Sequence, residues 1–173
     1  MIRKMTKANI TDYNKSSDEF AIIGRIVPRY DDGIWSYTEE IFKEHYTKQY
    51  ELDDMDDSYI EDKDRAVYFY YEDNRCTGQI RLNTNWNGFG LIEEIYVAKG
   101  SRHKGIGTAL LNQAEEWAKQ NQLIGLMLET QDVNLLACRF YAKHNFVIGA
   151  VDTMLYSKFP SAHEKAVFWY HRF

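Results

Sequence analysis

A short basic segment in the second half of the chain has the residue types needed to bind an anion. It reads Arg102-His103-Lys104-Gly105-Ile106-Gly107 and leads into a stretch with helical periodicity. The start of a helix offers unpaired N–H groups and the positive end of the helix dipole, and glycine lets the backbone approach a phosphate closely. We therefore predict a pyrophosphate-binding turn, to which Arg102, His103 and Lys104 add side-chain donors.

The spacing of these glycines excludes two common nucleotide-binding motifs. No G-x-x-x-x-G-K-[ST] occurs, so the segment is not a P-loop. The dinucleotide-binding fingerprint is also incomplete, because Leu110 stands where its third glycine would fall. Two glycines alone are equally compatible with an ordinary turn before a helix.

Two adjacent carboxylates, Glu93 and Glu94, interrupt the apolar segment Leu91–Val97. Charged residues are uncommon inside an apolar strand unless they face a cleft or an edge. Successive side chains of a strand point to opposite faces, so we expect at most one of the two to point into any given site. Both could instead be ordinary carboxylates at the surface or at the end of a sheet.

The elements that must position these residues follow from hydrophobic periodicity and turn signals. They are strands at 66–71, 76–82 and 91–97, a helix at 105–120, a strand at 123–130, a helix at 133–144, and strands at 146–156 and 166–173. This order predicts one α/β domain with a mixed sheet over residues 1–173. Residues 20–50 mix helical and β signals around Pro28 and Gly33, and we expect substrate-specific elements there.

Composition limits the partners of the protein. The net charge is -5, which disfavours nucleic acid and suits a cationic partner. Residues 51–64 contain eight acids and one lysine, which indicates either a solvated loop or frayed helix, or a rim that attracts a polycationic substrate.

Cysteine spacing and hydropathy bound the remaining possibilities. Cys76 and Cys138 have no metal-ligand spacing, so we expect reduced thiols and no metal. No signal peptide or membrane-spanning segment is evident, which favours a cytoplasmic protein. The sequence leaves the oligomeric state open, a homodimer included.

Two motifs together resemble those of the GNAT superfamily of acyl-CoA N-acyltransferases. Its [RQ]-x-x-G-x-[GA] pattern is matched by Arg102, Gly105 and Gly107. Its later N-x-x-A-x-x-x-Y pattern is matched by Asn134, Ala137 and Tyr141. The glycine that often follows is replaced by Asn145, a residue type that also tolerates the left-handed conformation at a helix end. The resemblance covers about residues 66–173.

Further stretches resemble the streptothricin acetyltransferases within that superfamily. They are residues 26–30 with Trp35, 92–95, 126–132, 151–156 and 164–170. The resemblance implies acetylation of an amine on the β-lysine part of a streptothricin-type antibiotic, and so resistance. Acetylation of a protein N-terminus or lysine, and a non-catalytic acetyl-CoA-binding module, are the alternatives.

The same resemblance implies a mostly antiparallel central sheet with helices on both faces. Acetyl-CoA would lie in a splay between strands 91–97 and 123–130. The implied cofactor-binding residues are Ile95, Tyr96, Val97, Arg102, His103, Lys104, Gly105, Ile106, Gly107, Thr108, Asn134 and Ala137.

The resemblance also implies direct transfer through a tetrahedral intermediate, with Tyr141 protonating the departing thiolate. A lysine-type amine enters as an ammonium, so a base must first remove its proton. We favour Glu93, which shares a face with Ile95, over Glu94, and a water relay could serve the other. From periodicity alone, Tyr141 is equally well a packed aromatic residue.

Carboxylates and aromatic residues near the expected cleft are candidates for binding the cationic substrate. They are Glu129, Asp132, Asp152, Tyr30 and Trp35. For each of these residues a purely structural role is at least as well supported by the sequence.

Overall fold

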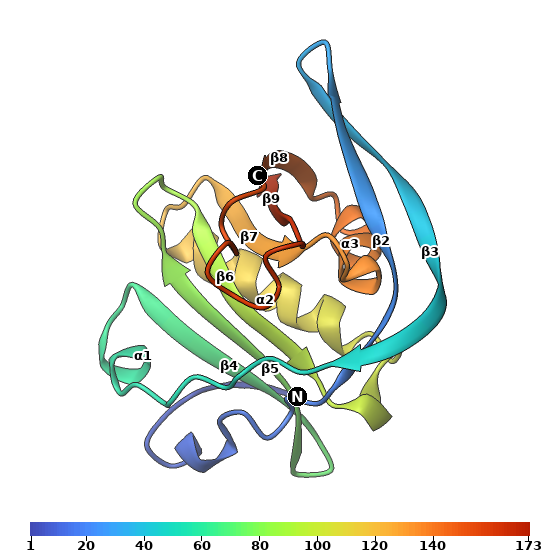
Figure 1. Ribbon diagram of the computed structural model, residues 1–173. Helices are drawn as coiled ribbons and strands as arrows, with labels where there is room; N and C mark the ends of the chain where they lie inside the picture. The colour runs from blue at the N-terminus through green and yellow to red at the C-terminus, as the bar shows by residue number, and fades with distance from the viewer. The chain divides into compact units, whose positions relative to one another are not determined.

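The computed structural model describes residues 1–173, which fall into two units. The first unit comprises residues 1–19, 49–126 and 172–173, and the second comprises residues 20–48 and 127–171. Figure 1 shows the elements of both. No helix is long and apolar enough to span a membrane.

Four strands of the first unit lie side by side, each antiparallel to its neighbour. In order they are β1 (Ile2–Lys4), β4 (Arg65–Glu72), β5 (Arg75–Thr84) and β6 (Gly90–Val97). Asp73 and Asn74 join β4 to β5 with φ of 47° and 63°. Positive φ at both central residues is the geometry of a tight hairpin turn, so the hairpin expected from the sequence is confirmed.

Helix α2 (Ile106–Gln120) packs on β4, β5 and β6 through a buried apolar face. The helix lies so close to β5 that a Cβ atom on Gly78 would be 2.8 Å from Cγ2 of Ile106. Any larger residue at position 78 would have to displace Ile106. The short helical segments of the unit are η1 (Ile10–Asp12), α1 (Ser58–Glu61) and η2 (Lys99–Ser101).

The second unit contains a long hairpin within residues 20–50, where the sequence shows mixed helical and β signals. Strands β2 (Phe20–Asp31) and β3 (Ile34–Lys48) pair antiparallel around Asp32 and Gly33, whose φ values are 50° and 82°. Helix α3 (Leu135–Lys143) packs on β2.

Strands β7 (Gly125–Gln131), β9 (Ala166–Arg172) and β8 (Val147–Asp152) are neighbours in this order, and β8 and β9 are antiparallel. The chain has the α/β fold that we expected, with shifted boundaries. The strand expected at 146–156 ends at Asp152, because turns occupy most of residues 153–164. Both cysteines are free and buried, as expected.

Candidate functional site

The basic turn ends at a helix start that leaves N–H groups without helical partners. Gly105 is the N-cap of α2 with φ 82° and ψ 1°, and no side chain caps the helix. The first bond of the helix runs from the N–H of Ala109 to the carbonyl of Gly105, at 3.0 Å. The N–H groups of Ile106 and Gly107 precede it and have no acceptor in the helix. A Cβ atom on Gly105 would meet nothing within 4 Å, so open space adjoins the turn, and a pyrophosphate fits these donors.

The basic side chains of the turn are partly engaged within the protein. Arg102 donates through Nε to the carbonyl of Val97 at 2.9 Å and through Nη2 to the carbonyl of Glu19 at 3.0 Å. Its guanidinium thus fixes the loop and retains three further N–H donors. Lys104 lies 3.8 Å from the carboxylate of Glu72.

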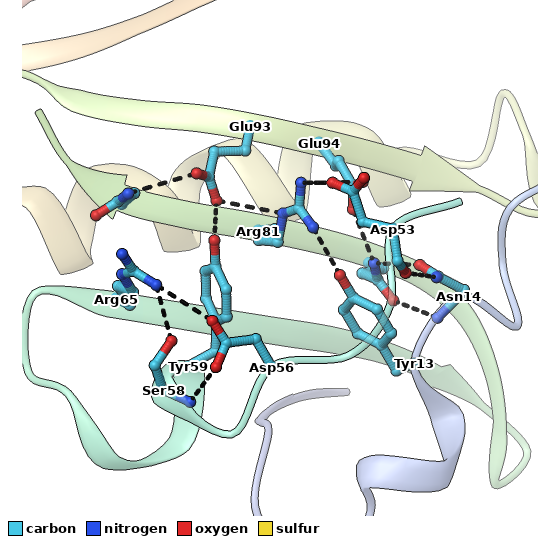
Figure 2. A network of polar contacts seen from close by, with 12 residues as sticks. Tyr13, Asn14, Asp53, Asp56, Ser58, Tyr59, Arg65, Arg81, Glu93 and Glu94 are labelled. Carbon is cyan, nitrogen blue, oxygen red and sulfur yellow. Dashed lines mark hydrogen bonds and ion pairs between the residues drawn. The ribbon is translucent and has the colours of Figure 1, made fainter. Parts of the chain in front are cut away.

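A β-bulge brings Glu93 and Glu94 to the same side of β6. Arg81 of β5 lies opposite Glu94 while Leu82 lies opposite Ile92, so Glu93 is the extra residue. Both carboxylates form ion pairs with Arg81, each at 3.2 Å (Figure 2). The bulge interrupts the alternation of side chains that the sequence suggested for this strand.

A partly buried network surrounds these two carboxylates (Figure 2). The hydroxyl of Tyr59 donates to Oε2 of Glu93 at 2.5 Å. Arg81 also donates to Asp53 at 2.6 Å and to the hydroxyl of Tyr13 at 2.8 Å. Burial raises the pKa of Glu94, against the opposing charge of Arg81. A carboxylate with a raised pKa is a better proton acceptor near neutral pH.

Sequence reasoning missed Arg81, Tyr59 and Asp53. The available signal was an arginine inside the expected strand 76–82, next to a strand with two acids. A buried arginine needs acceptors, and a neighbouring acidic strand is where it would find them.

Tyr141 lies in the second unit, on α3, and is 7% exposed. Its ring packs against Phe146 and Trp169, with centroids 5.8 Å and 6.4 Å away. Burial raises the pKa of its phenol, so the group stays protonated at neutral pH. The residue is a packed aromatic residue that also retains a transferable proton.

The spacing of Asn134 and Ala137 is that of a helix cap. Asn134 is the N-cap of α3, and its Oδ1 accepts the N–H of Ala137 at 3.3 Å. An asparagine cap bonds the N–H three residues on, which gives the N-x-x-A spacing a structural reason. At the other end Asn145 has φ 63°, so the expected left-handed helix end is confirmed.

Among the candidate substrate carboxylates, Glu129 differs from the other two. Burial raises its pKa to about 7, and its carboxylate accepts a hydrogen bond from the hydroxyl of Tyr156. Asp132 is buried and accepts the N–H of Lys165 at 2.9 Å. Asp152 accepts two backbone N–H groups of the turn that follows it, at 2.7 Å and 3.0 Å. Asp132 and Asp152 therefore stabilise the backbone, whereas the partner of Glu129 is a neutral tyrosine hydroxyl.

The two aromatic candidates lie at the end of the β2–β3 hairpin. Tyr30 and Trp35 are opposite each other in the strand register, with ring centroids 4.9 Å apart. Tyr30 is 58% exposed, so this residue is not part of the core. No group of three or more His, Cys, Asp or Glu side chains is arranged to hold a metal ion.

Comparison with known proteins finds relatives along the whole chain. Residues 34–146 match the Acetyltransferase (GNAT) family. Streptothricin acetyltransferase A of Bacillus subtilis (strain 168) is 58% identical over 173 residues, covering 100% of both chains. A streptothricin acetyltransferase of Escherichia coli is 40% identical over 126 residues, or 72% of this chain and 70% of that protein.

Solved structures give a consistent result. A protein of Bacillus anthracis str. Ames, assigned as a streptothricin acetyltransferase and solved in complex with acetyl coenzyme A, is 34% identical. It matches with a TM-score of 0.93 over 100% of this chain and 99% of that one. A nourseothricin acetyltransferase, 22% identical, shares the fold with a TM-score of 0.83 over 99% of this chain and 97% of its own.

Proposed function

Because the chain belongs to the acetyltransferase (GNAT) family, we propose that it acetylates an amine of a streptothricin-type antibiotic, with acetyl-CoA as donor, and so confers resistance. The observation that carries this proposal is the 58% identity to a streptothricin acetyltransferase over the full 173 residues. That identity includes residues 20–50, which lie outside both motifs shared with the superfamily. The similarity therefore extends beyond the cofactor site, and the amine we propose is that of the β-lysine part.

The cofactor of the enzyme is acetyl-CoA, which supplies an activated thioester when bound. In our proposal the pyrophosphate is held by the N–H groups of Ile106 and Gly107, by the free donors of Arg102 and by Lys104. The backbone of residues 95–97 at the end of β6 would hydrogen-bond the pantetheine arm. Asn134 would take part through the N-terminal end of α3, which it caps.

Proton removal from the substrate falls to the carboxylates beside the bulge. An amine with a pKa of about 10.4 is an ammonium at neutral pH and cannot attack until it loses a proton. The raised pKa of Glu94 favours this residue as the base. The alternative base is Glu93, which Tyr59 holds in place and which would receive the proton directly or through water.

Tyr141 is the proposed proton donor. A thiolate with a reference pKa of about 8.5 leaves more easily when a phenol gives it a proton. Burial raises the pKa of Tyr141, so its phenol carries a proton at neutral pH.

Glu129 is the proposed partner of a further cationic group on the substrate. Its buried carboxylate is bonded to a tyrosine hydroxyl, and a nearby cation would favour its ionised form. Tyr30 and Trp35 would add an aromatic surface for the same substrate. A cytoplasmic location is part of the proposal, since acetyl-CoA must reach the enzyme.

The test is thiol release from acetyl-CoA, with streptothricin, an aminoglycoside and a lysine-containing peptide as separate acceptors. We expect release with streptothricin only, and a product heavier by one acetyl group in mass spectrometry. Release with the peptide only would move the function to protein acetylation. No thiol release with any of the three acceptors, despite acetyl-CoA binding, would contradict the proposal.

A further inference from the structure

The acidic segment, residues 51–64, contacts the carboxylates of β6 through two of its side chains. Asp53 pairs with Arg81 at 2.6 Å, and Tyr59 bonds Glu93 at 2.5 Å. The segment is therefore attached to the site, and Asp53 shares Arg81 with the two glutamates. Most of residues 51–64 are exposed, as expected for a solvated loop or frayed helix, but Tyr59 is buried and connects the segment to β6.

Arg81 occupies the centre of this arrangement and is 9% exposed (Figure 2). Its Nη2 lies 2.6 Å from Asp53 and 3.2 Å from Glu94, and its Nε lies 3.2 Å from Glu93. The third nitrogen of Arg81, Nη1, donates a hydrogen bond to the hydroxyl of Tyr13 at 2.8 Å. Arg81 therefore contacts the two glutamates as ion pairs, through different nitrogens of one rigid plane, while its hydrogen bonds go to Asp53 and Tyr13. An ammonium is a single point charge and has no such plane.

The charges explain why such a residue is needed. Two adjacent carboxylates removed from water repel each other, and desolvation favours their protonated forms. A protonated carboxyl group cannot accept a proton from the substrate amine. A cation between the two opposes both effects and also fixes the geometry that the bulge creates.

We propose that Arg81 is a positioning residue for acetyl transfer, which holds Glu93 and Glu94 on one side of β6 with the help of Tyr59. The acidic segment then acts as a strap, because Asp53 and Tyr59 hold this arrangement from outside the sheet. The inference rests on the proposed function, since it assumes that one of these glutamates is the base.

The experiment compares three arginine variants by steady-state kinetics with acetyl-CoA and streptothricin across the pH range. Arg81→Gln removes the charge, and Arg81→Lys retains it without the planar fork. Arg65→Gln is the matched control: Arg65 pairs with Asp56 of the same segment and lies 5.4 Å from the ring of Tyr59, against 5.7 Å for Arg81. Arg65 forms no ion pair with either glutamate.

We expect Arg81→Gln to lower kcat about 100-fold, within the range that acid–base catalysis contributes. The acidic limb of its kcat/KM profile should move to higher pH, because the glutamates lose their counter-ion. Its KM for acetyl-CoA should stay within about twofold of the wild type. Arg81→Lys should restore the position of the acidic limb but only part of kcat, and Arg65→Gln should resemble the wild type.

Tyr59→Phe gives a second test that holds even if Arg81→Gln does not fold. A hydrogen bond to a charged group is strong enough that losing it should lower kcat about tenfold. A wild-type kcat in Tyr59→Phe, or a folded Arg81→Gln with the pH profile of Arg65→Gln, would overturn the inference.

The paired variant Glu93→Gln/Glu94→Gln separates this inference from the proposed function. If it is inactive while Arg81→Gln is active, only the positioning role is wrong. If it keeps full activity, the base assignment fails and the positioning role fails with it. If the wild type acetylates an amine other than streptothricin, the same variants are measured with that amine.

Discussion

Gly105 and Gly100 allow the conformation of the pyrophosphate turn to be tested with a matched pair of substitutions. A Cβ atom at either position would meet nothing within 4 Å, but only Gly105 has a left-handed φ, of 82°. Alanine in that conformation costs about 1–2 kcal/mol. Where φ is ordinary, glycine to alanine instead stabilises by about 0.4–1 kcal/mol through the unfolded chain. The difference between the two variants therefore isolates backbone conformation from packing.

These free energies translate into measurable shifts. For a chain of this size, each kcal/mol moves the melting temperature by about 2–4 °C. Gly105→Ala should therefore unfold about 2–8 °C below the wild type. Gly100→Ala should unfold at or slightly above it. Thermal unfolding followed by circular dichroism measures both.

The same pair should separate in acetyl-CoA binding. Relaxation of the backbone at position 105 would turn the N–H groups of Ile106 and Gly107 away from the pyrophosphate. A loss of about 1.4 kcal/mol of binding free energy lowers the affinity about tenfold. We expect KM for acetyl-CoA to rise about tenfold in Gly105→Ala and to stay unchanged in Gly100→Ala. Equal melting temperatures and equal KM values in the two variants would refute the reasoning.

Two further predictions concern the second unit. Tyr141→Phe should keep the ring packing and the KM for acetyl-CoA but lower kcat about 100-fold in the thiol-release assay; a wild-type kcat would remove Tyr141 from the mechanism. Burial raises the pKa of Glu129 from 4.5 to about 7 in the folded state, so the folded state binds more protons between these pH values. The wild type should therefore lose stability as pH rises through this window, whereas Glu129→Gln should not. The same change in melting temperature between acidic and neutral pH in both proteins would contradict this.

Local signals allowed a good part of the fold to be predicted. The left-handed residues that flank two helices, Gly105 before α2 and Asn145 after α3, follow from backbone preferences that a residue and its neighbours determine. The hairpin of β4 and β5 is likewise a local structure, with its turn at Asp73 and Asn74. Such elements were found because their energetics depend on a few adjacent residues.

The β2–β3 hairpin was not predicted because most of its length lacks a buried face. In β2 only Ile22, Gly24 and Ile26 are buried, and no residue of β3 is. An exposed ribbon has weak hydrophobic alternation, and Pro28 further weakened the strand signal. The Asp32-Gly33 pair was nevertheless a hairpin signal that could have been used.

The arrangement of Glu93 and Glu94 depends on how β6 pairs with β5, which cannot be read from the sequence of β6 alone. Within residues 91–97 the two carboxylates alternate, and the bulge arises only from the register of β6 against β5. Arg81, which pairs with both glutamates, comes from the partner strand, and its own partner Asp53 comes from the acidic segment. Residues from separate segments thus cooperate in one charge cluster. A variant at Asp53 should therefore alter the pH dependence of catalysis through Arg81.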